Sequence, residues 1–181
     1  KHLLSVLQKF IISLVTFLQQ VSYPVCSVVR RMSDKEWRNE NDLKVDFIIN
    51  EVTNGDENAS AYLYDLSAAA RIVDDIYDEF ENVNPSHAML MVEILFVRIP
   101  SNPFFQTYRK ELETYHFAMW QAWEASNALE NGDETDRIYH HVLRDYCNEI
   151  LLFVALKCLG YNQVKEVNLL IRRLFNKKLG E

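Results

Sequence analysis

Residues 150–159 read Ile-Leu-Leu-Phe-Val-Ala-Leu-Lys-Cys-Leu, and Lys157 is the only charged side chain among them. A stretch that is apolar on nearly every side is typical of a helix in the centre of a bundle, because a surface helix has only one apolar face. Gly160 follows at once, and glycine is the residue that most often ends a helix. The sequence therefore predicts an all-α fold around a central helix at residues 150–159.

On both sides of this stretch, apolar residues recur every three or four positions, which indicates further helices. Only four glycines and four prolines interrupt the 181 residues, and such long uninterrupted segments argue against an all-β chain. The second expected helix should turn Leu63, Leu66 and Tyr77 inward, and residues 89–99 are apolar enough to be expected in the interior. We expect a compact bundle of about six helices. Their residues are 43–52, 60–81, 85–99, 103–129, a segment that leads into 150–159, and a last helix from about 163 onward. Ser60 is the expected cap of the second helix, and Thr135 or Asp136 that of the segment before 150–159.

Charge divides the chain at Arg31/Met32. Residues 1–31 contain four cations and no acid, so a total of −7 with +4 in this part leaves −11 for residues 32–181. Residues 1–21 show an apolar face with the spacing of an amphipathic helix. We predict an amphipathic leader or appended helix at residues 1–31 and a single helical domain at 32–181. Three interpretations of the leader remain open: a helix facing the core or a partner, a helix lying on a membrane surface through residues 1–21, and a targeting segment.

Composition excludes several classes of function. The acidic body would repel a phosphate backbone, which makes nucleic acid an unlikely partner. The odd number of cysteines (Cys26, Cys147 and Cys158) indicates unpaired thiols in a reducing compartment, and we expect a cytoplasmic protein. Neither a phosphate-binding glycine loop nor a Gly-x-Ser-x-Gly motif occurs, so we expect no cofactor and favour a non-enzymatic protein.

The acidic string Asp74-Asp75-Ile76-Tyr77-Asp78 is similar to the aspartate-rich motif of class I terpene synthases and isoprenyl transferases. That resemblance implies that Asp74, Asp75 and Asp78 hold Mg²⁺ ions and a prenyl diphosphate. The family also needs a second metal-binding segment later in the chain, which this sequence lacks. The alternative is that the aspartates form a solvated helix face, with Arg71 pairing to Asp75.

A metal-binding helical bundle, or a metal-dependent enzyme, is a further alternative. Glu113 and His116 have the Glu-x-x-His spacing that directs both side chains toward one metal in a four-helix bundle. His141 and Asp145 lie one turn apart on the next helix, so an antiparallel hairpin would bring the two pairs together. The competing interpretation is that His140 and His141, between Arg137 and Arg144, belong to an exposed polar face.

Two tryptophans are the candidate partner-binding residues. Trp120 and Trp123 lie three positions apart on a helix whose apolar stripe points elsewhere, and aromatic side chains of this kind anchor protein interfaces. We therefore expect a protein partner or a homo-oligomer. The cations Arg172, Arg173, Lys177 and Lys178 near the end of the last helix are expected to serve the helix dipole rather than to bind nucleic acid or lipid.

The final 80 residues resemble small helical proteins of unknown function encoded by tailed bacteriophages. The resemblance rests on Asn102-Pro103-Phe104-Phe105, Ala122-Trp123-Glu124-Ala125, Leu129-Glu130-Asn131-Gly132, Val142-Leu143-Arg144-Asp145 and Ile171-Arg172-Arg173-Leu174-Phe175. It implies a phage product in the cytoplasm of a bacterial host. The leading expectation is a non-enzymatic protein-binding module, such as a phage accessory or host-interaction protein.

Overall fold

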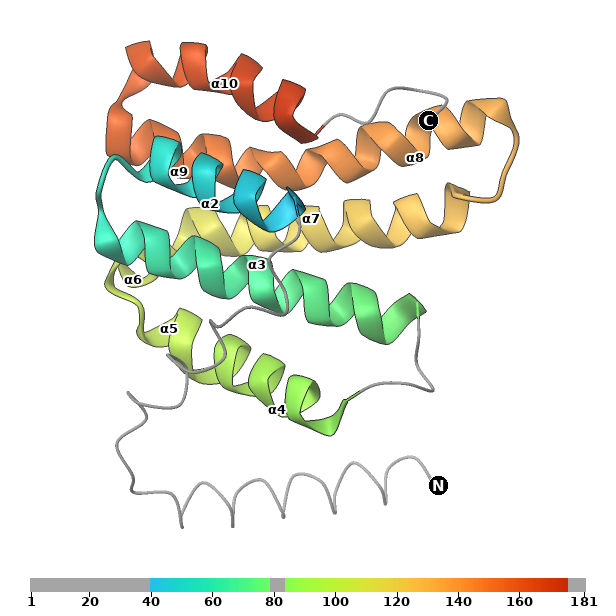
Figure 1. Ribbon diagram of the computed structural model, residues 1–181, viewed down its shortest axis with the longest axis horizontal. Coiled ribbons are helices and arrows are strands. Elements are labelled where there is room, and N and C mark those ends of the chain that lie inside the picture. Colours follow the sequence, from blue (N-terminus) through green and yellow to red (C-terminus); the bar gives the residue numbers. More distant parts are fainter. Residues whose placement is uncertain (1–39, 79–83, 176–181) are drawn as a thin grey trace. The chain divides into compact units, whose positions relative to one another are not determined.

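The computed structural model describes residues 40–78 and 84–175, which are helices joined by short loops (Figure 1). By its contacts the chain divides into the units Lys1–Asn39 and Glu40–Glu181, and every described residue belongs to the second. The predicted leader helix, the 1–31/32–181 boundary, a membrane surface through residues 1–21, Cys26 and the cations Lys177 and Lys178 lie outside the described residues. The elements are α2 (Glu40–Thr53), α3 (Glu57–Asp78), α4 (Pro85–Glu93), the π-helix η4 (Ile94–Arg98), α5 (Ile99–Ser101), α6 (Pro103–Thr107), α7 (Arg109–Leu129), α8 (Glu134–Asp145), the 3-10 helix η5 (Tyr146–Asn148), α9 (Glu149–Leu159) and α10 (Tyr161–Phe175).

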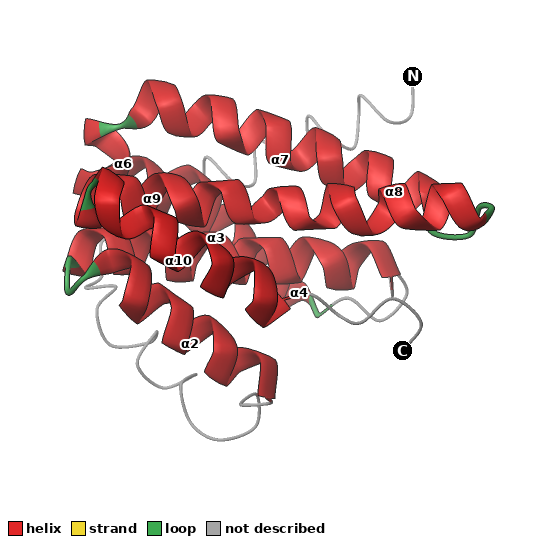
Figure 2. Ribbon diagram, turned by 90° about the horizontal axis from the view of Figure 1, so that it is seen from above, coloured by secondary structure: helices red, strands yellow, loops and turns green. Residues whose placement is uncertain are grey.

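The described part contains no strand, so the predicted all-α bundle is confirmed (Figure 2). The helix α9 is central, because it packs against α2, α3, α7 and α10. Its Ile150, Phe153, Val154 and Ala155 are buried in one hydrophobic core. Gly160 ends α9 with φ at 84°, a conformation that residues other than glycine rarely adopt. The sequence prediction for residues 150–159 is therefore correct in both position and role.

The start of α3 differs from the prediction. Asn54 and Gly55 adopt positive φ angles of 49° and 81° and end α2, as expected from the sequence. Asp56, rather than Ser60, caps α3, because its Oδ1 accepts hydrogen bonds from the backbone N–H groups of Asn58 and Ala59. Ser60 lies one turn inside the helix, where its hydroxyl is 2.8 Å from Thr53 Oγ1.

Residues 89–99 are less buried than predicted. Asn84 caps α4 as expected, and its side chain accepts from Ser86 N. Along the following turns only Ile94 and Ile99 are buried, whereas the side chain of Phe96 is 75% exposed. The reason is position: among the described elements outside this segment, α4 and η4 pack mainly on α3, which covers one face of the segment.

The α7–α8 hairpin forms with a different cap from the one predicted. Asp133, rather than Thr135 or Asp136, caps α8, since its side chain accepts from Asp136 N while the Asp136 side chain accepts from Asp133 N. The helix expected at 103–129 is interrupted at Tyr108, whose φ and ψ of −113° and 24° separate α6 from α7. Among the described helices, none combines the length and the apolar character needed to cross a membrane.

Candidate functional site

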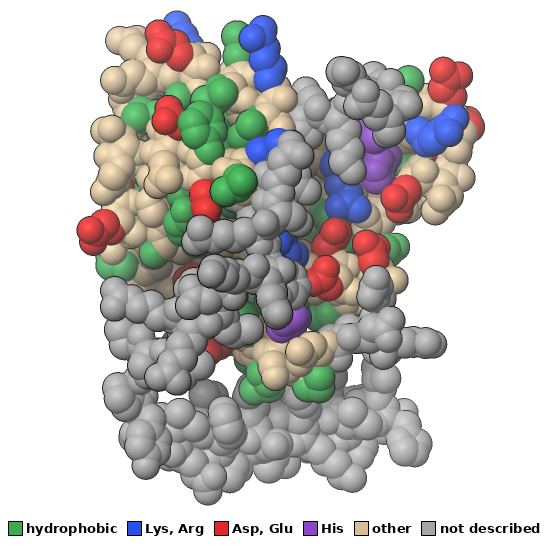
Figure 3. Space-filling view, viewed as in Figure 1, with side chains coloured by type: hydrophobic (Ala, Val, Ile, Leu, Met, Phe, Trp, Pro, Cys, Tyr) green, Lys and Arg blue, Asp and Glu red, His purple; other side chains and the backbone are tan. Residues whose placement is uncertain are grey.

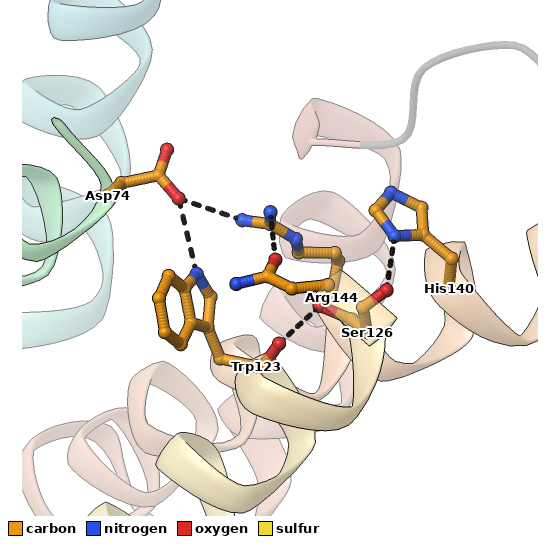
Figure 4. Close-up of polar contacts among 6 residues, drawn as sticks. Asp74, Trp123, Ser126, His140 and Arg144 are labelled. Carbon is orange, nitrogen blue, oxygen red and sulfur yellow. Dashed lines mark hydrogen bonds and ion pairs between the residues drawn. The ribbon is translucent and has the colours of Figure 1, made fainter. Parts of the chain in front are cut away.

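A polar network joins α3, α7 and α8 (Figure 4). One carboxylate oxygen, Asp74 Oδ1, accepts a hydrogen bond from the indole N–H of Trp123 at 3.2 Å and from Nη1 of Arg144, also at 3.2 Å. The second guanidinium nitrogen, Arg144 Nη2, donates to Asn127 Oδ1 at 2.7 Å. Trp123 and Arg144 are 49 and 70 positions away from Asp74 in the sequence, and both donate to the same carboxylate oxygen.

The helix α8 turns its polar side toward α7. His140 lies one turn before Arg144, and its Nδ1 donates to the carbonyl of Ser126 at 2.9 Å. The hydroxyl of Ser126 donates in turn to the carbonyl of Trp123 at 2.7 Å. The predicted exposed polar face is therefore wrong for His140 and Arg144, which are half-buried, and correct for His141, which is exposed. The reason is that hydrogen bonding to α7 decides which side of α8 faces inward.

Two buried donors of the network have no acceptor among the described residues. They are Arg144 Nε and Asn127 Nδ2. The orientation of the Asn127 amide follows from its neighbour, because only the carbonyl oxygen of the amide can accept from the guanidinium. An unpaired buried donor typically costs about 1–3 kcal/mol, so the network stabilises the fold less than its number of hydrogen bonds suggests.

Two aromatic rings pack against the Trp123 ring of the network. The ring of Trp123 meets the edge of Tyr77 with centroids 5.2 Å apart and that of Trp120 with centroids 5.9 Å apart. The guanidinium carbon of Arg144 lies 5.9 Å from the centre of the Trp123 ring. Tyr77 is 58% exposed, while both tryptophans are half-buried. We call Tyr77, Trp120 and Trp123 the aromatic cluster.

Tyr77 is more exposed than the apolar stripe of α3 predicts, although it lies on the same side of the helix as the buried Ala59 and Leu66. The apolar stripe of α3 was expected to include Tyr77, whereas the buried face of α3 ends with Ala69 and Ile72. A usable signal was present, because Tyr77 lies three positions after Asp74 and residues at this spacing share a helix face. The candidate residues Trp120 and Trp123 do lie together, and Trp123 also takes part in the polar network.

The aspartates are not equivalent. Asp75 and Asp78 are exposed, as the solvated-face interpretation predicts, whereas Asp74 is half-buried and paired with Arg144. Both bonds go to one oxygen of Asp74, and the positive charge of Arg144 beside this carboxylate opposes the binding of Mg²⁺. The resemblance to the aspartate-rich motif of prenyl-diphosphate enzymes therefore gains no support from the geometry.

The four candidate metal ligands are not brought together, although α7 and α8 form the predicted hairpin. Glu113 is exposed and pairs with Arg109 at 2.7 Å, while His116 turns toward α3, with Nε2 2.6 Å from the hydroxyl of Tyr62. Asp145 is held by Arg172, and the ring of His141 contacts that of His140. Within residues 40–78 and 84–175, no group of three or more His, Cys, Asp or Glu side chains is arranged to hold a metal ion.

Tyr62 and His116 form a neutral pair in the core. Burial raises the pKa of Tyr62 and lowers the pKa of His116, so both side chains favour their uncharged forms. The Tyr62 ring stacks on those of Phe104 and Phe105. This pair contributes to the contact between α3 and α7. The nearby charge of Glu113 opposes the effect of burial on the pKa of His116 but does not cancel it.

Arg172 links α10 to the helices before it. Its guanidinium bonds to the carboxylates of Asp145 and Glu149, and also to the carbonyl of Asp145. Burial lowers the pKa of Arg172, but the hydrogen bond to Glu149 and the charge of Asp145 outweigh this effect and raise the pKa overall. Arg172 therefore makes specific ion pairs, which the sequence analysis did not predict, in addition to lying in the last turn of α10. Cys147 and Cys158 are free thiols, as predicted.

Comparison with known proteins yields no match: no protein-family model, no curated protein and no solved structure is similar to this chain. The function must therefore be argued from the site itself.

Proposed function

We propose that this chain is a non-enzymatic protein-binding module that holds its partner at the aromatic cluster. The observation that carries the proposal is the exposed Tyr77 ring set edge-on against a half-buried Trp123. Tryptophan, tyrosine and arginine are the residues that most often dominate binding energy at protein interfaces. The cluster offers the first two types beside Arg144, which stacks near the Trp123 ring.

The polar network supports this role because it fixes the cluster before a partner arrives. The indole N–H of Trp123 is bonded to Asp74, and the helix that carries Trp123 is bonded to α8 through His140. Side chains that are already ordered lose less conformational entropy on binding than free ones. A rigid aromatic surface with a charged rim is the arrangement that favours specific association.

The test is capture by the full chain from an extract of the organism that carries the gene, followed by affinity measurement with the captured protein. Tyr77→Ala should weaken binding at least about tenfold, as expected for an interface anchor. The matched control is Tyr161→Ala on α10, because Tyr161 is 68% exposed and lies on another helix. Both variants should melt at the temperature of the unmodified chain. Equal affinity of Tyr77→Ala and the unmodified chain for every captured protein would refute the proposal.

We propose further that the partner is a bacterial host protein. This extension depends on the sequence resemblance of residues 102–181 to phage-encoded helical proteins. Capture from a bacterial extract tests this extension directly. A partner that binds the unmodified chain and not Tyr77→Ala would support it, and the absence of any such protein would remove it.

A further inference from the structure

A second surface, on α8, exposes apolar side chains in a regular pattern. Ile138 and Val142 are four residues apart on one side of α8, and Tyr139 lies beside them. Tyr146, four residues after Val142, is the first residue of η5, which follows α8 directly. In the order Ile138, Val142, Tyr139 and Tyr146, these side chains are 49%, 59%, 57% and 42% exposed. No residue of α8 is fully buried. We call these four residues the α8 stripe.

The stripe is distinct from the side of α8 that packs on the bundle. His140 and Arg144 bond to residues of α7, and they are two positions away from Ile138, Val142 and Tyr146 in sequence. At about 100° per residue, two positions correspond to opposite sides of a helix. The aromatic cluster and the α8 stripe are therefore separate surfaces, and the inference below does not depend on the proposed function.

The size of the stripe indicates what can bind there. From Ile138 to Tyr146 the helix rises about 12 Å, or a little over two turns. A stable dimer needs roughly 800 Å² and 20–30 residues from each partner, which four side chains do not supply. An amphipathic helix needs only three or four apolar anchors, at positions i, i+3 or i+4, and i+7, and these match the length of the stripe.

Charge indicates the kind of helix. The turn before α8 and its first residue expose the acids Glu130, Asp133 and Glu134, and Glu134 lies one turn before Ile138 on the same side. Residues 32–181 carry −11 in total, and the face shown in Figure 3 has Asp and Glu side chains at several places, with Lys and Arg side chains among them. Two such bodies repel each other, whereas a basic segment is attracted over a distance of about a Debye length.

We infer that the α8 stripe is a docking site for a basic amphipathic helix of a partner protein. The partner's apolar residues pack on Ile138, Val142 and Tyr146, and its Lys or Arg residues face the acids at the start of α8. Apolar contact provides the affinity, and the acidic turn sets the direction in which the helix lies.

The test uses the full chain and three synthetic peptides of about 18 residues, which corresponds to five helical turns. The first peptide contains Leu and Lys, with Leu recurring every third or fourth residue. The second has the same composition in a scrambled order, and the third replaces every Lys of the first by Glu. Fluorescence anisotropy of the labelled peptides gives the affinities. We expect the patterned Leu/Lys peptide to bind, and the scrambled and acidic peptides to bind at least about tenfold more weakly.

Variants locate the binding site. The double change Ile138→Gln/Val142→Gln should weaken binding of the patterned peptide at least about tenfold. The matched control is Leu43→Gln/Leu169→Gln, because these side chains are 59% and 60% exposed on α2 and α10. The control should bind as the unmodified chain does. Tyr139→Ser is a milder change on the stripe, and it should weaken binding in the same direction.

Several outcomes would overturn the inference. Equal loss in the control variant, or equal binding of the scrambled peptide, would show that charge alone attracts the peptide. A dimer of the unmodified chain in light scattering that becomes a monomer in Ile138→Gln/Val142→Gln would assign the stripe to a second copy. Binding to vesicles of phosphatidylcholine that is lost in the same variant would assign it to a lipid surface.

Discussion

The Asp74→Asn substitution removes one charge from the junction of α3, α7 and α8 and preserves the shape of the side chain. The carbonyl oxygen of Asn can still accept the indole N–H of Trp123, so the loss is confined to the charged bond with Arg144 at 3.2 Å. A hydrogen bond to a charged group typically contributes about 1.5–3 kcal/mol. Because the side chains of Arg144 and Asp74 are 34% and 43% exposed, water screens the pair. We expect the free energy of unfolding to fall by about 1–1.5 kcal/mol.

Equilibrium unfolding in urea measures this change. The matched control is Asp78→Asn, because Asp78 is exposed in the last turn of the same helix, where a negative charge is unfavourable. This control should leave stability unchanged or raise it by about 0.3 kcal/mol. Combining Asp74→Asn with Arg144→Met should give a coupling energy of about 0.5–1.5 kcal/mol. A coupling near zero, or equal stability of the two Asn variants, would show that the Asp74–Arg144 bond does not hold these helices together.

Three further changes test the core pair, the Arg172 ion pairs and the end of α9. Burial lowers the pKa of His116 below 6.5, so the unfolded chain binds a proton at this site more readily than the folded chain does. The contribution of neutral His116 to the free energy of unfolding should therefore be complete above about pH 6.5 and decrease as the pH falls. Thermal melting between about pH 7.5 and 5.5 should show this loss of stability, and His116→Gln should reduce the change of melting temperature with pH. An unchanged pH dependence in His116→Gln would contradict the role of His116. Arg172→Met should cost about 1–3 kcal/mol in urea unfolding, whereas Arg173→Met, at an exposed position, should cost under about 0.5 kcal/mol. Gly160→Ala should lower the free energy of unfolding by about 1–3 kcal/mol, because φ and ψ of 84° and 169° are strained for any residue with a Cβ. The added carbon itself meets no atom within 4 Å beyond its chain neighbours. Equal stability of this variant and the unmodified chain would contradict the prediction.

Local signals explain which parts of the fold the sequence predicted. The central position of α9 followed from a run of apolar residues that leaves no side for water. The ends of α2 and α9 and the start of α4 followed from Asn54-Gly55, Gly160 and Asn84-Pro85. These residues act through their own backbone angles or through hydrogen bonds to neighbours two or three positions away, and such effects are visible in a short window of sequence.

Contacts between distant residues explain what the sequence could not predict. Asp74 meets Trp123 and Arg144 across 49 and 70 positions, and no local pattern specifies such partners. Apolar content also failed to predict burial, because Phe96 lies in an apolar segment that packs on α3 with one face, and its own side chain is 75% exposed. Glu113 and His116 have the spacing of metal ligands and share a helix face, yet His116 bonds to the Tyr62 hydroxyl and Glu113 to Arg109.

The orientation of α8 connects the two proposed surfaces. Burial of an apolar side chain of the size of Ile or Val stabilises a fold by about 1.5–3 kcal/mol, so burial alone would favour turning Ile138 and Val142 toward α7. The structure instead directs His140 and Arg144 toward α7 and leaves the stripe exposed. The hydrogen bonds from His140 to Ser126 and from Arg144 to Asn127 favour this rotation of α8, which the proposed docking at the stripe requires. Arg144 serves both surfaces, because it stacks near Trp123 and fixes the rotation of α8.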